Sequence, residues 1–302
     1  MIRRKSLRKS QEANTARKGS ALCKVFLVFS LFVISGSVSG CALLDQLMPG
    51  GEQEEKKTVD YNAVPEPVLP LYAHRGLSAD YVENTPEAFA QAYLKGATQV
   101  EIDVWATTDG VLYVSHDNNL KRVYGKDLFI SESTSKQVAG SQAANGQEIM
   151  TFQEMLDKFG DKLTYLVELK EGLKDVPLFV EVVKNNPELE KNIQVQGWDA
   201  KVLDAVEQDL PDMFKMQLLE DLAKLPAGLK SEAVNGISIK WDLMTPNVYK
   251  RIRNAGKKIV CWTVNDGKVS DHLFSMGVDG IISDSPKSIM NRYTSFLASQ
   301  NK

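Results

Sequence analysis

From residue 68 onward, short apolar runs alternate along the chain with segments whose apolar positions recur at helical spacing. Short apolar runs bounded by polar residues are typical of strands that are buried on both faces. The pattern therefore predicts eight strands, each followed by a helix. The predicted strands span residues 68–73, 98–104, 163–169, 192–196, 213–218, 236–240, 258–264 and 279–283.

Three of the predicted helices carry residues that mark where a helix begins. The segment 86–95 follows Thr85 and starts at Pro86, which combine a capping side chain with a first-turn proline. The segment 152–159 opens with a Thr-x-x-Glu capping box, and the segment 246–255 again starts with Thr and Pro. These signals place helices between the predicted strands, as an alternating α/β fold requires.

Strand–helix units that alternate in this way fit a (β/α)₈ TIM barrel, for which about 250 residues is typical. A doubly wound open sheet is the alternative, but no glycine-rich phosphate loop follows the first strand. The alternation is broken once, where residues 111–117 form a further apolar run inside the long connection 105–150. We therefore predict a TIM barrel with an extra hairpin strand in the loop after the second strand.

The start of the chain follows a different pattern. Residues 1–24 carry eight basic side chains and one acidic side chain, and the uncharged apolar run 25–34 follows them. A basic start, a short apolar run and small residues before a cleavage point are typical of a secretory signal. The run is shorter than the roughly 20 residues that span a membrane. Residues 38–41, Val-Ser-Gly-Cys, also resemble the bacterial lipobox, which implies cleavage before Cys41 and a lipid on its thiol.

The chain is thus predicted to have three parts. These are a lipoprotein-type signal peptide (1–40), a lipidated Cys41 with a polar tether (41–66) and a barrel domain (67–302). We expect the protein to be exported and held by its lipid anchor on the extracytoplasmic side of the cell membrane. A signal anchor and a soluble secreted protein are the alternatives.

Charge and cysteine content narrow the function classes. Removal of the signal takes eight of the 36 basic and one of the 39 acidic residues, which leaves 28 against 38. This acidic balance argues against a nucleic-acid partner, and no protein partner is predicted. Of the three cysteines, only Cys261 would remain free in the exported chain, which excludes an internal disulfide.

Acidic residues stand near the ends of the second and third predicted strands, where a barrel places its active site. Glu101 and Asp103 are two apart on a strand, so their side chains point the same way. Buried carboxylates that close together repel unless a cation lies between them. For these two alone, an ion pair with Arg75 or Lys170 is the simpler interpretation. With Glu168 as a third oxygen donor, the set favours a hard ion such as Mg²⁺ or Ca²⁺.

The chain has only three histidines, and two of them follow predicted strands. His74 and His116, together with the acids and Lys170, form a typical set for general acid/base catalysis. Arg75 adds a fixed positive charge whose fork of donors can hold two oxygens of a tetrahedral oxyanion at once. His272 lies in a short helical segment and is interpreted as a surface residue.

A series of motifs runs through the whole barrel domain and resembles the glycerophosphodiester phosphodiesterase family. These motifs are His74-Arg-Gly, Glu83-Asn-Thr, Glu101-Ile-Asp-Val, Thr108-Asp-Gly, His116-Asp, Glu168-Leu-Lys, Trp262-Thr-Val-Asn and Asp279-Gly-Ile-Ile-Ser-Asp-Ser-Pro. The resemblance implies a TIM barrel with a metal-dependent phosphodiesterase site. The implied roles are acid/base catalysis for His74 and His116, metal binding for Glu101, Asp103 and Glu168, and phosphate binding for Arg75 and Lys170.

The chain departs from the family pattern where Val82 replaces a proline and where Gly197-Trp198 replaces Ser-Phe. The family's small insertion domain is also short here. Val82 stands where the family's proline shapes a turn, so little catalytic effect is expected from it. The other two departures bear on the alcohol that is recognised rather than on the chemistry. Trp198 and Trp262 are expected to form an apolar wall for the glycerol carbons or the leaving group, whereas wall and core positions are equally favoured for Trp241.

The resemblance predicts metal-dependent hydrolysis of a glycerophosphodiester to glycerol phosphate and an alcohol. The nucleophile is either water or a neighbouring hydroxyl of the substrate, which would form a cyclic phosphate. Alternatives are a phospholipase-type lyase that releases a cyclic phosphate from a membrane lipid, and a non-catalytic glycerophosphodiester-binding lipoprotein. The sequence leaves open the alcohol, the choice between Mg²⁺ and Ca²⁺, which histidine is the acid, the oligomeric state and the type of cell envelope.

Overall fold

The computed structural model describes residues 71–300, and eight parallel strands in this range close into a barrel. The ring closes because β1 pairs in parallel with both β2 and β9. The predicted TIM barrel is confirmed. The barrel strands are β1 (Leu71–His74), β2 (Gln99–Ala106), β4 (Thr164–Leu169), β5 (Ile193–Gly197), β6 (Lys215–Leu219), β7 (Gly236–Lys240), β8 (Lys258–Trp262) and β9 (Gly280–Ser283).

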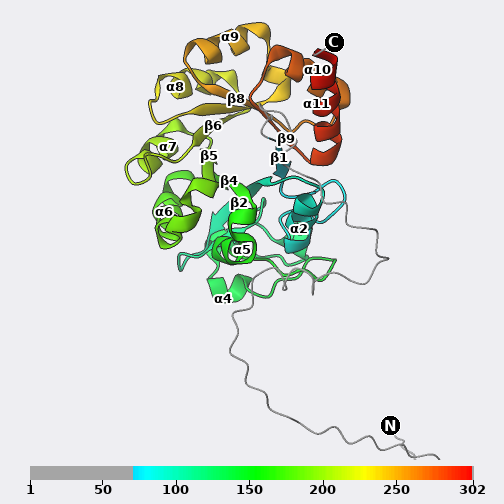
Figure 1. The fold of residues 1–302 in the computed structure, drawn as a ribbon. Coiled ribbons are helices and arrows are strands. Elements are labelled where there is room, and N and C mark those ends of the chain that lie inside the picture. The colour runs from blue at the N-terminus through cyan, green and yellow to red at the C-terminus, as the bar shows by residue number, and fades with distance from the viewer. Residues whose placement is uncertain (1–70, 301–302) are drawn as a thin grey trace, which may run out of the picture. The chain divides into compact units, whose positions relative to one another are not determined.

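Helices surround the barrel strands on the outside (Figure 1). Their starts follow the predicted signals: the Thr85 side chain accepts a hydrogen bond from the Ala88 amide, and Thr151 and Glu154 form a reciprocal capping box. The surrounding helices are α2 (Pro86–Leu94), α5 (Phe152–Phe159), α6 (Val176–Asn185), α7 (Ala200–Glu207), α8 (Leu225–Lys230), α9 (Pro246–Asn254), α10 (Gly267–Met276) and α11 (Pro286–Gln300).

Side chains inside the barrel form a small apolar cluster of their own. It comprises Tyr72, Leu166, Met216, Val260 and Ile282, all nearly or fully buried. Because side chains two apart on a strand point the same way, the next inward positions on β1, β4 and β8 are also directed into the barrel. Those positions hold His74, Glu168 and Trp262. The apolar cluster therefore forms a floor, and polar chemistry lies one layer above it, at the carboxyl ends of the strands.

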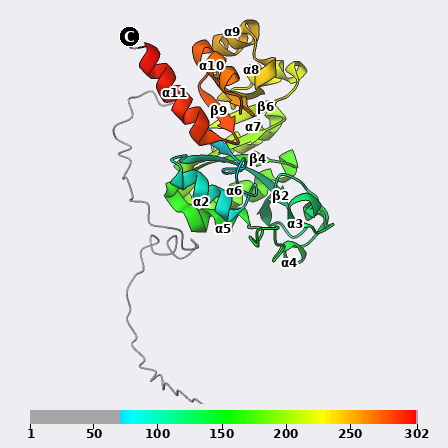
Figure 2. The same ribbon diagram turned by 90° about the vertical axis from the view of Figure 1, so that its right-hand side faces the viewer.

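The long connection after β2 contains the extra strand predicted from the sequence. This strand, β3 (Leu112–Val114), runs antiparallel to β2 and pairs Val104 with Val114. Two short helices follow, α3 (Lys121–Tyr124) and α4 (Ser135–Val138), and Figure 2 shows both beside the β2 side of the barrel. The connection has its own apolar cluster, which includes Tyr113, Leu120, Tyr124, Ile130 and Val138.

The predicted signal peptide, Cys41, the tether and the first residues of the first predicted strand lie outside the described residues. Within residues 71–300, no helix combines the length and the apolar character needed to cross a membrane.

Candidate active site

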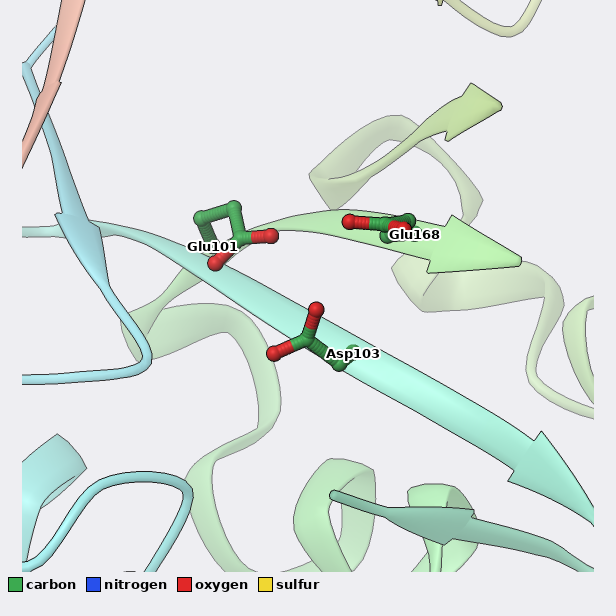
Figure 3. Close-up of side chains that lie close together, drawn as sticks. All are labelled: Glu101, Asp103 and Glu168. Atoms are coloured by element: carbon green, nitrogen blue, oxygen red, sulfur yellow. The ribbon is translucent and has the colours of Figure 1, made fainter. Parts of the chain in front are cut away.

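The three predicted metal-binding carboxylates lie together at the carboxyl end of the barrel. Glu101 and Asp103 come from β2, and the strand register pairs Asp103 with Glu168 on β4. One oxygen from each carboxylate lies within 4.8 Å of the other two, and Figure 3 shows the three groups pointing into a common space. All three residues are buried, with at most 5% of their surface exposed.

Two cations compensate part of this negative charge. Lys170 Nζ lies 2.8 Å from both Asp103 Oδ1 and Glu168 Oε1, and Arg75 Nε lies 3.3 Å from Asp103 Oδ2. Burial alone would raise the pKa of Asp103, but the charges of Lys170 and Arg75 hold that pKa well below its ordinary value. The opposite holds for Glu101, where burial and the charges of Asp103 and Glu168 raise the pKa well above its ordinary value.

The donor set fits a divalent metal ion. Glu101 Oε2 is buried and has no hydrogen-bond partner, so it is available as a ligand. Two cationic side chains face three carboxylates, so a further positive charge would relieve the repulsion that raises the pKa of Glu101. The ligand atoms are oxygens, which suit Mg²⁺ or Ca²⁺ better than Zn²⁺.

His74 ends β1 beside the carboxylates. Its Nδ1 lies 2.5 Å from Asp284 Oδ1, and its Nε2 lies 4.0 Å from Glu101 Oε2. Asp284 is itself held by the Ser78 hydroxyl at 3.0 Å and the Asn265 amide at 2.5 Å. Burial opposes ionisation of Asp284, but the bond to His74 lowers its pKa to about 2, so the carboxylate remains charged. Asp284 thereby turns the Nε2 edge of the imidazole toward the carboxylate cluster.

His116 follows β3 and reaches the site from the long connection. Its Nδ1 lies 2.7 Å from Oδ1 of its neighbour Asp117. Asp117 Oδ2 in turn accepts a hydrogen bond of 2.5 Å from Arg122 Nε on α3. Partial burial lowers the pKa of His116, which favours its neutral form.

Strained backbone surrounds Arg75. Among the described residues, Arg75 and Asn84 are the non-glycine residues with positive φ, at 56° and 55°. The backbone N–H of Asn84 donates to the Arg75 backbone carbonyl at 3.0 Å. The side-chain Nδ2 of Asn84 donates to Asp103 Oδ2, also at 3.0 Å. Gly76, at φ +85°, packs so closely on α2 that a Cβ would lie 2.7 Å from the Ala88 carbonyl carbon. Unfavourable backbone conformations of this kind concentrate at functional sites.

A cavity of about 400 Å³ that includes solvent at its mouth lies beside these groups. The Trp198 and Trp262 rings meet edge to face in its wall, with centroids 5.9 Å apart. Trp198 is more than an apolar surface, because its Nε1 donates a 2.8 Å hydrogen bond to Glu168 Oε1. Trp241 is 40% exposed and belongs neither to the core nor to this wall. The cavity is lined by His74, Arg75, Glu101, His116, Glu168, Lys170, Gln196, Trp198, Leu218, Trp262, Thr263 and Ile282.

Sequence reasoning missed several residues that contact this site. Asp284 binds the His74 ring directly, and Arg122 binds the Asp117 carboxylate that contacts His116. Gln196 Nε2 donates to Glu101 Oε1 at 3.0 Å. Asp284 was visible as the acid directly after the last predicted strand, where strand-end residues gather. His272 is exposed on α10, outside the site, as expected.

Comparison with known proteins shows relatives along most of the chain. A glycerophosphodiester phosphodiesterase of Caldanaerobacter subterraneus subsp. tengcongensis is 28% identical over 235 residues, covering 73% of this chain and 96% of the relative. One from Bacillus altitudinis is 28% identical over 231 residues, covering 72% of this chain and 94% of the relative.

Solved structures show the same fold. An Oleispira antarctica phosphodiesterase in complex with the product sn-glycerol-3-phosphate matches with a TM-score of 0.69 at 24% identity, covering 74% of this chain and 96% of that one. The glycerophosphodiester phosphodiesterase of Thermotoga maritima matches with a TM-score of 0.64 at 26% identity, covering 74% of this chain and 98% of that one. Residues 74–288 match the sequence profile of the glycerophosphoryl diester phosphodiesterase family. The chain therefore belongs to this family of phosphodiesterases, which confirms the resemblance that its motifs indicated.

Proposed function

We propose that this protein hydrolyses glycerophosphodiesters to glycerol phosphate and an alcohol, with a divalent metal ion and two histidines. The observation that carries the proposal is that one cavity is lined by both His74 and His116 and by Glu101 and Glu168 of the acidic cluster. The substrate class rests on the relatives named above. The Oleispira protein holds sn-glycerol-3-phosphate as its product, which is the product that we assign to this reaction.

The carboxylates of Glu101, Asp103 and Glu168 would hold the metal ion. When bound, such an ion supplies Lewis acidity that stabilises negative charge on a phosphate oxygen. Mg²⁺ and Ca²⁺ are the candidates, because every ligand is an oxygen. Asn84 and Gln196 orient two of the carboxylates by donating hydrogen bonds to Asp103 and Glu101.

Arg75 and Lys170 lie in the cavity wall, where their positive charges can face the phosphate group. Both already contact Asp103, so their side chains are held in place before a substrate arrives. Donors fixed in advance stabilise the charge of a transition state without further reorganisation. In this way a chain with a net negative charge can still provide a local binding site for an anion.

The two imidazoles carry the proton transfers. One removes a proton from the nucleophile, which is water or a neighbouring substrate hydroxyl, and the other protonates the leaving alcohol. Asp284 and Asp117 each bind the Nδ1 side of one ring, so Nε2 is the nitrogen left for proton transfer in both.

The test is a turnover assay with three substrates, glycerophosphocholine, a glycerophosphoglycerol oligomer and a phospholipid, each with and without a chelator. We expect glycerol phosphate and the free alcohol to form only when Mg²⁺ or Ca²⁺ is present. Accumulation of a cyclic phosphate from a phospholipid would identify the lyase instead. Tight binding without turnover would identify a binding protein.

We further propose that the protein is an exported lipoprotein anchored through Cys41. The basic start, the apolar run and the Val-Ser-Gly-Cys sequence support this proposal. In cells fed a radiolabelled fatty acid, the wild-type chain should take up label and fractionate with membranes. A Cys41→Ser variant should remain unlabelled, and equal labelling of both chains would contradict the proposal.

A further inference from the structure

The guanidinium group of Arg122 joins two loops at the cavity mouth. Arg122 lies on α3, in the connection after β2, and does not itself line the cavity. Its Nε donates to Asp117 Oδ2 at 2.5 Å, and its Nη1 and Nη2 donate to the two oxygens of Glu83 at 2.8 Å each. The bidentate pair with Glu83 uses the fixed fork geometry that only arginine provides.

Both carboxylates that Arg122 holds also hold a residue of the site. Asp117 Oδ1 binds His116 Nδ1 at 2.7 Å, and Glu83 Oε1 accepts a 3.0 Å hydrogen bond from Arg75 Nη1. An unbroken series of charged contacts therefore runs from an acid/base candidate on one loop to a phosphate-binding candidate on another. Arg122 is the member that links the two halves.

The neighbouring lysine shows how an ordinary surface charge on this helix behaves. The Lys121 side chain is 71% exposed, and it pairs at 3.7 Å with Asp127, whose side chain is 67% exposed. Exposed pairs of this kind contribute roughly 0–1 kcal/mol to stability. The Arg122 side chain is 50% exposed, yet three of its donor atoms are engaged, and its partner Glu83 is only 18% exposed.

We propose that Arg122 is a positioning residue that holds His116 and Arg75 in their working orientation through Asp117 and Glu83. The inference rests on the proposed phosphodiesterase function. It gives the long connection a role in the reaction, because docking of α3 onto the Glu83 loop sets two groups at once. Loss of Arg122 should therefore affect both substrate binding, through Arg75, and turnover, through His116.

The experiment compares Arg122→Gln and Arg122→Lys with the control Lys121→Gln, which removes an adjacent charge on the same helix. We expect Arg122→Gln to lower kcat/KM by about 10–100-fold, the usual cost of losing a partner that orients site groups. The loss should be shared between a lower kcat and a higher KM. Arg122→Lys should recover little, because the single ammonium nitrogen cannot span both carboxylates as the three nitrogens of the planar guanidinium do. Lys121→Gln should match the wild type.

A second measurement does not depend on activity. The chain has three histidines, so imidazole NMR signals can be assigned by removing each in turn. Arg122→Gln should move the His116 ring signals and leave those of His272 in place. The proposal is overturned if Arg122→Gln stays within twofold of wild-type kinetics, if its loss of activity merely follows a lower melting temperature, or if the His116 signals do not move. Should the wild type fail to cleave any glycerophosphodiester, the proposed function fails, and the NMR result still decides whether Arg122 orients His116.

Discussion

The two sides of the cavity differ in chemistry and in where they come from along the chain. We call the lining from β1, β2, β4 and the long connection the charged side, and the lining from β5 to β9 the uncharged side. The charged side comprises His74, Arg75, Glu101, His116, Glu168 and Lys170. The uncharged side comprises Gln196, Trp198, Leu218, Trp262, Thr263 and Ile282.

Under the proposed function, this division would separate the groups that react from those that recognise the substrate. Ions on the charged side need one another, since each buried carboxylate is tolerated only beside a cation or a metal ion. The uncharged side supplies a wall of low polarity, which strengthens the electrostatic contacts across the cavity. Substitutions on the charged side should therefore abolish turnover, whereas those on the uncharged side should change which substrates are preferred.

The largest effect is expected from the carboxylates that we propose as metal ligands. Glu101→Gln or Glu168→Gln keeps the shape of the side chain but removes a charged ligand. We expect kcat/KM to fall by at least about 10³-fold, because loss of metal activation costs several kcal/mol of transition-state stabilisation. Calorimetric titration with Mg²⁺ and Ca²⁺ should show the matching loss of metal binding. Unchanged metal affinity in both variants would move the ion away from this cluster.

Removal of either imidazole should have the next largest effect. His74→Ala and His116→Ala should each lower kcat by about 10²–10⁴-fold, the usual contribution of a positioned acid or base. Metal binding should persist in both variants, because neither ring belongs to the carboxylate cluster. The matched control is His272→Ala on the exposed face of α10, which should behave as the wild type. Near-normal turnover of either site variant would remove that histidine from the mechanism.

Substitutions of Trp262 and Trp198 on the uncharged side should have two different effects on kinetics. Trp262→Phe keeps an aromatic wall, and we expect it to change the ratio of kcat/KM between two alcohols by about 10-fold, in line with 1–3 kcal/mol per apolar contact. Trp198→Phe also removes the hydrogen bond to Glu168, so it should lower kcat for every substrate by a similar factor. Identical profiles for both variants would show that the Glu168 bond has no separate role.

The smallest effect on activity is expected at a buried acid outside the cavity. Asp175 precedes α6, and burial raises its pKa to about 6, although the charge of Lys174 opposes this rise. Because this value lies above the unfolded pKa of about 3.9, wild-type stability should fall as pH rises from about 4 to 6 and stay level above that. The Asp175→Asn variant has no carboxyl group here, so it does not lose stability over this pH range. Its unfolding free energy relative to the wild type should therefore increase by about 1–3 kcal/mol between pH 4 and pH 8.

Denaturant titrations at both pH values measure this difference, and turnover should be unchanged. A difference between variant and wild type that does not vary with pH would mean that Asp175 keeps an ordinary pKa. This result would sharpen the comparison, since Asp103 owes its low pKa to the charges of Lys170 and Arg75, and neither of these contacts Asp175.

Most of the fold was predictable because strand and helix signals are local. Thr85 and the Thr151 capping box mark helix starts within a few residues, and β1 to β9 lie within three residues of the apolar runs. The carboxylate cluster was also accessible, because spacing alone puts Glu101 and Asp103 on one face of a strand.

The remaining contacts depend on the register of the strands and on the closure of the barrel, and short stretches of sequence reveal neither. Asp284 lies 210 positions from His74, and they meet only because β9 pairs with β1. Arg122 contacts Glu83, which lies 39 positions earlier in the sequence. The contact forms because α3, a short helix within the long connection, docks beside the loop that holds Glu83. The orientation of the Trp198 ring toward Glu168 likewise depends on packing rather than on residue type.

The seam between the first and the last strand has a consequence for how the protein is made. His74 is synthesised 210 residues before Asp284, whose carboxylate holds it. A nascent chain that lacks β9 would leave this imidazole without its partner and the ring of strands open. The ability to catalyse turnover should therefore appear only once β9 and Asp284 have been synthesised and have closed the ring.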